Sequence, residues 1–201
     1  NGVRMSAPFG GIGVWINEMD HGGPNSDSYP YIDKNGNPIN HLGTHDDKHG
    51  GWDEWGTDEN NRLVHNLHAT FDSKLYLAGS LKNGIFYTDA SNTLILVGQG
   101  DAQGYMATYT HGSGLSAGIL PGSSDVKAGD YIGRMGDNGY SGGTHLHFQA
   151  YQNGTPFSNQ QMNNTFIQPF FTDHVQGNTF LQNLEWQMQN VYARLKYGKP
   201  R

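Results

Sequence analysis

Two histidines separated by one residue form the pattern in this sequence that most suggests chemistry: His145-Leu146-His147, followed by Phe148. Side chains alternate across a β-strand, so both imidazoles would project from one face, with their Cα atoms about 6.6 Å apart. At that separation one imidazole can hold a metal ion while the other reaches a water bound to the ion. Leu146 and Phe148 would point into an apolar core on the opposite face. Alone, such a pattern more often marks two solvated strand histidines.

The residues upstream of this pattern favour the metal-site interpretation. They comprise Tyr-x-His at residues 109–111, Val-Lys-x-Gly-x-x-Ile-Gly at 126–133, and Gly-x-x-Gly-Tyr-Ser-x-Gly-x-His-Leu-His-Phe at 136–148. Together these motifs, within a continuous stretch at about 105–150, resemble the zinc endopeptidases of the lysostaphin/LytM type. Enzymes of that family cut the peptide part of bacterial cell walls.

Composition independently favours a turn-rich β protein and excludes several classes of function. The chain has 201 residues, of which 29 are Gly, 35% are hydrophobic and only 15% are charged. Glycine is thus about twice its usual share, and charge lies well below the usual quarter. The net charge of −6 argues against a nucleic-acid partner, which would require a basic face. No apolar run approaches the roughly 20 residues of a membrane span. The sequence contains no cysteine, so a metal would need His and carboxylate ligands.

Local patterns predict where the elements that position these residues lie. Residues 5–15 are expected to form a turn that leads into a short strand, and residues 94–100 and 104–110 predict two strands of a hairpin. Asn153-Gly154 is a hairpin-type turn, and residues 156–178 are expected to be irregular. Apolar residues then recur at helical spacing over about 179–197. We therefore predict a mainly β (β-rich α+β) fold, with an antiparallel sheet, long loops around a groove and one C-terminal amphipathic helix.

We expect a single domain over residues 1–201, with a catalytic core at about 5–155 and a C-terminal extension that carries the helix. The helix is most simply explained by core packing, although a partner-binding role remains open. The chain begins at Asn1 without a signal peptide, so we expect a mature product or an excised domain.

A histidine-rich run precedes the predicted sheet, because His41, His45, His49 and Asp53 follow one another at intervals of four. This spacing would align them on a helix, but interrupting glycines disfavour one. Residues 49–53 instead resemble the His-x-Gly-x-Asp metal motif of the family. A straight strand would hold His49 and Asp53 about 13 Å apart. The chain must therefore bend between them, and the glycine pair allows that bend.

A second pair, His68 and Asp72, leaves an alternative open. Residues 75–78 and 83–85 resemble a strand and hairpin of the family. The interval from Asp53 to Leu75 is 22 residues, longer than the family pattern, which implies an insertion. The second pair falls within that insertion, lacks the central glycine and lies close to the strand. We therefore prefer His49 and Asp53 as ligands.

The resemblance implies one zinc ion per chain with three protein ligands, namely His49, Asp53 and His147. Such a set leaves a fourth position for water and suits Zn²⁺, which lowers the pKa of its bound water to about 7 and polarises a carbonyl. The resemblance also places His111 and His145 beside the metal water. One would act as general base and the other would support the oxyanion, with Tyr109 as a possible assistant.

We therefore expect a zinc-dependent endopeptidase that hydrolyses peptide cross-links or bridges of bacterial peptidoglycan, in cell-wall lysis or remodelling. It would work as a monomer, extracellularly at the cell wall or on a phage virion, with peptidoglycan peptides as its partners. One alternative is a catalytically inactive member of the same fold that binds the wall or a partner protein. Another is an unrelated β-sandwich binding module with chance histidines. Candidates for all five site residues argue against the first, and the extended motifs argue against the second.

Overall fold

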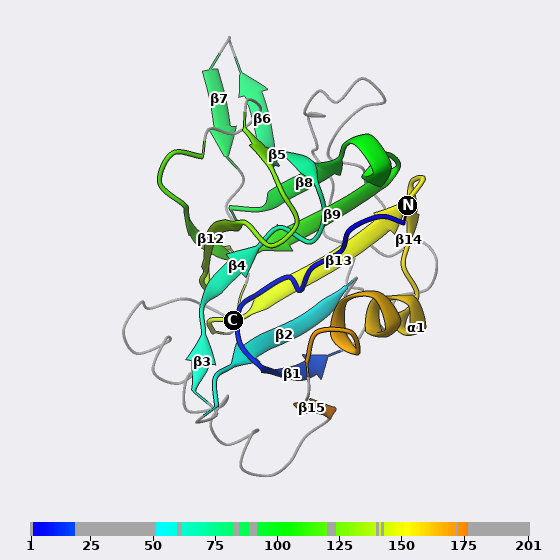
Figure 1. Ribbon diagram of the computed structural model, residues 1–201. Coiled ribbons are helices and arrows are strands. Elements are labelled where there is room, and N and C mark those ends of the chain that lie inside the picture. The colour runs from blue at the N-terminus through cyan, green and yellow to red at the C-terminus, as the bar shows by residue number, and fades with distance from the viewer. Residues whose placement is uncertain are drawn as a thin grey trace.

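The protein is strand-dominated, as a computed structural model shows (Figure 1). The structure describes residues 2–18, 51–59, 62–82, 85–88, 92–119, 124–139, 141, 143–171 and 173–176. Within these ranges its strands form three sheets. Neighbouring strands are antiparallel, except for one parallel pair at an edge. The predicted mainly β, antiparallel fold is therefore confirmed.

The largest sheet contains ten strands. The order along it is β11 (Asp125–Val126), β5 (Ser73–Leu77), β8 (Leu94–Gly98), β9 (Tyr105–Thr110), β13 (Leu146–Gln152), β2 (Trp52–Thr57), β1 (Gly13–Glu18) and β15 (Asp173–Gln176). Two short strands lie off this path: β14 (Thr155–Pro156) pairs with β13, and β3 (Leu63–Val64) pairs with β2. β15 runs parallel to β1. Strand β13 therefore lies between β9 and β2, with partners on both sides (Figure 1).

Two smaller sheets and three short helical segments complete the described structure. The three-stranded sheet has the order β10 (Gly112–Leu115), β12 (Tyr131–Met135) and β4 (Asn66–His68). The two-stranded sheet pairs β6 (Gly79–Lys82) with β7 (Ile85–Thr88). The helical segments are a 3-10 turn at Gly100–Ala102, the α-helix α1 (Asn159–Met162) and a π-helical turn at Asn163–Ile167. Among the described residues, no helix has the length and apolar character needed to cross a membrane.

Several local predictions are confirmed. β8 and β9 pair as antiparallel neighbours across the turn at Gly100–Ala102. At the end of β13, Asn153 and Gly154 have φ of 50° and 78°, as a type I′ hairpin turn requires. The short strand after the N-terminal turn is β1. The C-terminal helix predicted at about 179–197 lies outside the described residues.

The expectation that residues 156–178 are irregular was wrong. Helix α1 begins after Ser158, whose hydroxyl accepts from the Gln161 N–H, while the Gln161 side chain accepts from the Ser158 N–H. This reciprocal capping box stabilises a helix of only four residues, which is too short to produce a periodic pattern. Phe166 and Ile167 in the following turn are buried, so core packing fixes this segment.

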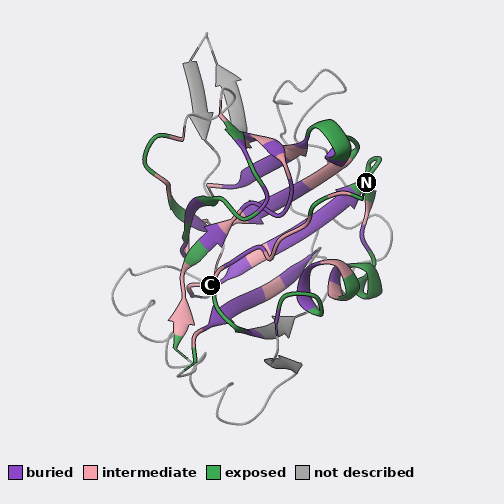
Figure 2. Cartoon of the chain, viewed as in Figure 1, coloured by how far each residue is buried: buried purple, intermediate pink, exposed green. Residues whose placement is uncertain are grey.

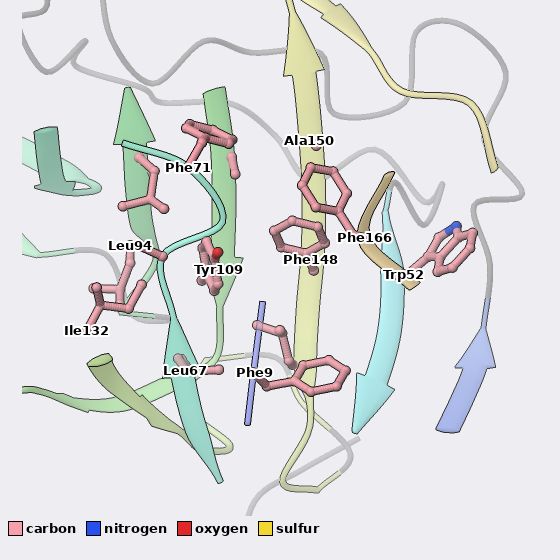
Figure 3. Packing of buried hydrophobic residues seen from close by; sticks show 14 of the residues in the cluster. Phe9, Trp52, Leu67, Phe71, Leu94, Tyr109, Ile132, Phe148, Ala150 and Phe166 are labelled. Atoms are coloured by element: carbon pink, nitrogen blue, oxygen red, sulfur yellow. The ribbon is translucent and has the colours of Figure 1, made fainter. Parts of the chain in front are cut away.

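Buried residues concentrate on the central strands β9, β13 and β2 (Figure 2). Leu146 and Phe148 of β13 are fully buried, as the strand pattern predicted, and so is Ala150. The Phe148 ring lies 5.0 Å from that of Tyr109 and 5.2 Å from that of Phe166, measured between centroids (Figure 3). The side chains of β13 between these core residues project from the opposite face, and that face carries the site.

Candidate metal centre and active site

Strand register brings Asp53 and His147 side by side. His147 of β13 lies directly opposite Asp53 of β2 on one side and Thr110 of β9 on the other. Directly opposed residues in an antiparallel pair share a face of the sheet, so Asp53 and His147 project together, away from the core. Two further histidines flank this pair at the same end of the sheet. His111 follows the last residue of β9, and His145 precedes the first residue of β13.

One carboxylate oxygen connects two of the histidines. Asp53 Oδ1 lies 3.0 Å from His147 Nδ1 and 3.2 Å from His145 Nε2. The His111 ring centroid lies 4.6 Å from that of His145 and 6.1 Å from that of His147. All four side chains are largely shielded from solvent, with 16% exposure at most. The structure therefore brings four of the five predicted site residues together, while His49 lies outside the described residues.

The backbone at His111 turns its side chain toward this cluster. His111 has φ of 69°, the left-handed conformation, which interrupts the alternation of side chains along β9. Its Nδ1 donates to the Asn138 carbonyl at 2.6 Å, because a carbonyl oxygen can only accept. Burial, and then the neighbouring His145, lower the pKa of His111 to about 3. His111 is therefore neutral near pH 7, with Nε2 as the acceptor nitrogen.

A short turn fixes the ring of His145. Its Nδ1 donates to the Gly143 carbonyl at 2.8 Å, which directs Nε2 toward Asp53. The Ser141 hydroxyl donates to the same carbonyl at 2.6 Å and lies 3.3 Å from His145 Nδ1. The sequence motifs included Ser141 but gave it no role, and they did not identify Asn138. Both act by holding a histidine ring, a contact that only the folded chain reveals.

Glycine is required where β2 approaches β13. Gly51 has φ of 100°, and an added Cβ would lie 2.7 Å from the Phe148 carbonyl oxygen and 3.1 Å from His147 Nε2. A larger residue would therefore push the start of β2 away from His147. The sequence predicts that the chain bends between His49 and Asp53 at its pair of glycines. The positive φ of Gly51 is a conformation that such a bend can use.

The alternative pair, His68 and Asp72, lies away from the cluster, with His68 at the end of β4 in the three-stranded sheet. Asp72 precedes β5, which β8 and β9 separate from β13, a displacement of about 14 Å at normal strand spacing. Its carboxylate accepts from the Ala128 N–H at 3.0 Å and from Lys127 Nζ at 2.9 Å, and these bonds lower the pKa of Asp72. His68 Nδ1 donates to the Gly129 carbonyl at 3.0 Å. Both side chains are thus engaged away from His145 and His147.

Tyr109 also lies away from the site. Its hydroxyl donates to the His68 carbonyl at 2.8 Å and lies 3.2 Å from Thr70 Oγ1. Burial raises the pKa of this fully buried phenol. The suggestion that Tyr109 assists the reaction is therefore wrong, because its side chain belongs to the core (Figure 3).

The donor atoms present suit a zinc ion. At ordinary Zn–N and Zn–O distances, two tetrahedral ligands lie about 3.3 Å apart, close to the 3.0 Å between Asp53 Oδ1 and His147 Nδ1. One carboxylate and one imidazole are also ligand types that zinc accepts. Within the described ranges no group of three or more His, Cys, Asp or Glu side chains forms a metal site. The third ligand that the sequence predicts, His49, lies outside those ranges.

A buried carboxyl group lies next to the site but faces the core. Glu54 follows Asp53 on β2, is fully buried, and neither of its carboxyl oxygens has a hydrogen-bond partner in the described part of the chain. Burial, and then the charge of Asp53, raise the pKa of Glu54 well above its ordinary value of 4.5. The folded protein therefore holds this carboxyl protonated where the unfolded chain would ionise it.

This raised pKa predicts a loss of stability as the pH rises. The contribution of neutral Glu54 is fully present below pH 4.5 and declines as the pH rises toward its folded-state pKa, by at most about 1.4 kcal/mol per pH unit. Glu54→Gln should remove this decline, because an amide does not titrate. Urea unfolding from pH 4.5 upward would measure it, with Glu59→Gln, at an exposed position, as the control. Parallel curves for wild type and Glu54→Gln would contradict the prediction.

Comparison with known proteins identifies a family. The sequence model described as Peptidase family M23 matches residues 55–159, just over half of the chain. The match begins two residues after Asp53. No curated protein matches the chain.

Several solved structures are similar to the chain. Lysostaphin from Staphylococcus simulans is 25% identical, with 64% of this chain and 48% of that chain covered and a TM-score of 0.44. A zinc-containing peptidase from Vibrio cholerae is 18% identical, with 77% and 38% covered and a TM-score of 0.45. The chain thus spans less than half of each. A chain of the SpoIIIAH–SpoIIQ complex is 17% identical, with 78% and 97% covered and a TM-score of 0.50, a likeness of fold alone.

Proposed function

The chain belongs to peptidase family M23, and on this premise we propose that it is a zinc-dependent endopeptidase that hydrolyses peptide cross-links or bridges of bacterial peptidoglycan. One observation carries the proposal: Asp53, His147 and His145 converge at 3.0 and 3.2 Å, with the His111 ring alongside. The family match also argues against an unrelated sandwich with chance histidines.

In this proposal His49, Asp53 and His147 hold the zinc ion. A zinc ion held there would lower the pKa of a bound water to about 7 and would polarise the scissile carbonyl. Asp53 has a second contribution, because its contact with His145 orients that imidazole. The partly shielded surroundings of these side chains strengthen their electrostatic interactions.

His111 and His145 share proton transfer and oxyanion support. Each ring donates from Nδ1 to a backbone carbonyl, which fixes its orientation and turns Nε2 toward the cluster. One imidazole takes the proton of the attacking water and returns it to the leaving amine. The other, which must carry a proton on Nε2 as well as on Nδ1, donates a hydrogen bond from Nε2 to the oxyanion that forms at the substrate carbonyl.

We expect the purified protein to contain one zinc ion per chain. Elemental analysis would measure the stoichiometry, and treatment with a chelator should abolish hydrolysis until zinc is restored. The proposal would be wrong if the purified protein contained no zinc and chelators left its hydrolytic activity unchanged.

Turbidity clearing of purified bacterial cell walls tests the activity, and mass spectrometry of the released fragments identifies the bond that is cut. An inactive, wall-binding member of the family would sediment with the walls without clearing them. Since the proposed substrate lies in the wall, we propose that the protein acts as a monomer outside the cytoplasm, at the wall or on a phage virion.

A further inference from the structure

Strand β2 carries two buried tryptophans that face opposite sides of the sheet. Trp52 and Trp55 are 1% and 4% exposed, and an odd separation along a strand places them on opposite faces. Trp52 donates from Nε1 to Oδ1 of Asn159, the first residue of α1, at 2.7 Å. Trp55 shares its face with Asp53 and donates from Nε1 to the Thr144 carbonyl at 2.5 Å. Only Trp55, of these two, contacts the turn that carries His145.

Trp55 contacts this turn both through its indole N–H and through its ring. Thr144 directly precedes His145, so the hydrogen bond fixes the peptide unit from which the histidine side chain begins. The indole ring lies 6.0 Å from the His145 imidazole, at an interplanar angle of 52°. On the other side, the His145 N–H donates to the Gly136 carbonyl at 3.1 Å. The backbone around His145 is therefore held on one side by the Trp55 side chain of β2 and on the other by Gly136, which follows β12.

We propose that Trp55 is a positioning residue for His145, and that its indole N–H keeps Nε2 of His145 at working distance from Asp53. Without this donor the Thr144 carbonyl oxygen would lose its hydrogen-bond partner, and the turn could shift until the oxygen is paired again. A displacement of about 1 Å at a reacting group can reduce the rate by about 100-fold. The catalytic part of this inference rests on the proposed function, whereas the positioning part does not.

A matched pair of variants tests the inference. Trp55→Phe and Trp52→Phe each remove one indole N–H from the same strand and keep an aromatic ring. We expect Trp55→Phe to lower kcat by about 10- to 100-fold, with KM and zinc content unchanged, whereas Trp52→Phe should keep a kcat close to wild type. Trp55→Tyr, which restores a donor at the end of the ring, should recover part of the loss.

A second measurement does not depend on activity. In ¹⁵N-labelled protein, the ring signals of His145 should shift or broaden in Trp55→Phe and remain unchanged in Trp52→Phe. If Trp55→Phe does not fold, Trp55→Tyr takes its place, with a smaller loss of kcat and smaller shifts expected. Wild-type kcat together with wild-type His145 signals would overturn the inference. If wild-type protein fails to cleave walls, the proposed function fails, but the NMR comparison still decides whether Trp55 positions His145.

Discussion

In the Asp53→Ala variant we expect zinc binding and wall hydrolysis to be lost together. The substitution removes a proposed ligand and also the carboxylate that lies 3.2 Å from His145 Nε2. Losing only an outer-shell partner of a metal site costs about 10- to 100-fold in affinity or activity, so the loss of a ligand should exceed that range. Asp53→Asn, which keeps the shape and removes the charge, should show the same direction of change.

Asp72→Ala is the matched control, since it removes the carboxylate of the second His-x-x-x-Asp pair. Asp72 bonds only to Ala128 and Lys127 among the contacts described above, and the Lys127 side chain is 69% exposed. We expect a cost of about 1 kcal/mol in stability, with zinc and activity retained. Zinc content measured in both purified variants decides the matter. An empty site in Asp72→Ala with a full site in Asp53→Ala would mean that the ligands are wrongly assigned.

His145→Ala and His111→Ala should each abolish hydrolysis while zinc remains bound. Neither imidazole is needed as a ligand in the proposed site, yet each lies beside the reacting groups. General acid–base catalysis contributes about 10²- to 10⁴-fold to rate, and one oxyanion donor about 10²- to 10³-fold. Hydrolysis rates and zinc content of the two variants would be measured side by side.

His68→Ala provides the histidine control for this pair. Its ring bonds to the Gly129 carbonyl and lies 6.2 Å from the Tyr131 ring, away from the cluster. The variant should keep both zinc and activity. Loss of zinc in His145→Ala or His111→Ala would instead identify that residue as a ligand.

Strands could be predicted where a short stretch of sequence carries an apolar run, an alternating pattern or a recognisable turn. β8 and β9 follow from two apolar runs joined by a short glycine-containing turn, and the alternation in β13 places Leu146 and Phe148 in the core. α1 could not be predicted, because a helix of four residues shows no periodicity. Its capping box, formed by Ser158 and Gln161, was the one local signal available.

The site is formed by residues that are far apart in the sequence, so no local sequence pattern predicts that they lie together. Asp53 and His147 are 94 positions apart in the chain, and only the resemblance of their two motifs to one family associated them. Tyr109 and His111 show the opposite problem, because residues two apart on a strand should share a face. The positive φ of His111 separates them, so one faces the cluster and the other enters the core. The positive φ of His111 could not be predicted from its residue type, because histidine adopts that conformation only occasionally.

The central place of β13 in its sheet bears on how the protein acquires its metal. Strands with partners on both sides, packed against a core, usually open only when the whole domain unfolds. β13 is hydrogen-bonded to β9 and to β2, so His147 and Asp53 are held in register by the backbone itself. A small zinc finger folds around its ion, whereas here the pairing of β2 with β13 and the apolar core fix the strands that carry Asp53 and His147. Metal loss should therefore leave the scaffold folded, so that the same chain can be loaded and emptied repeatedly.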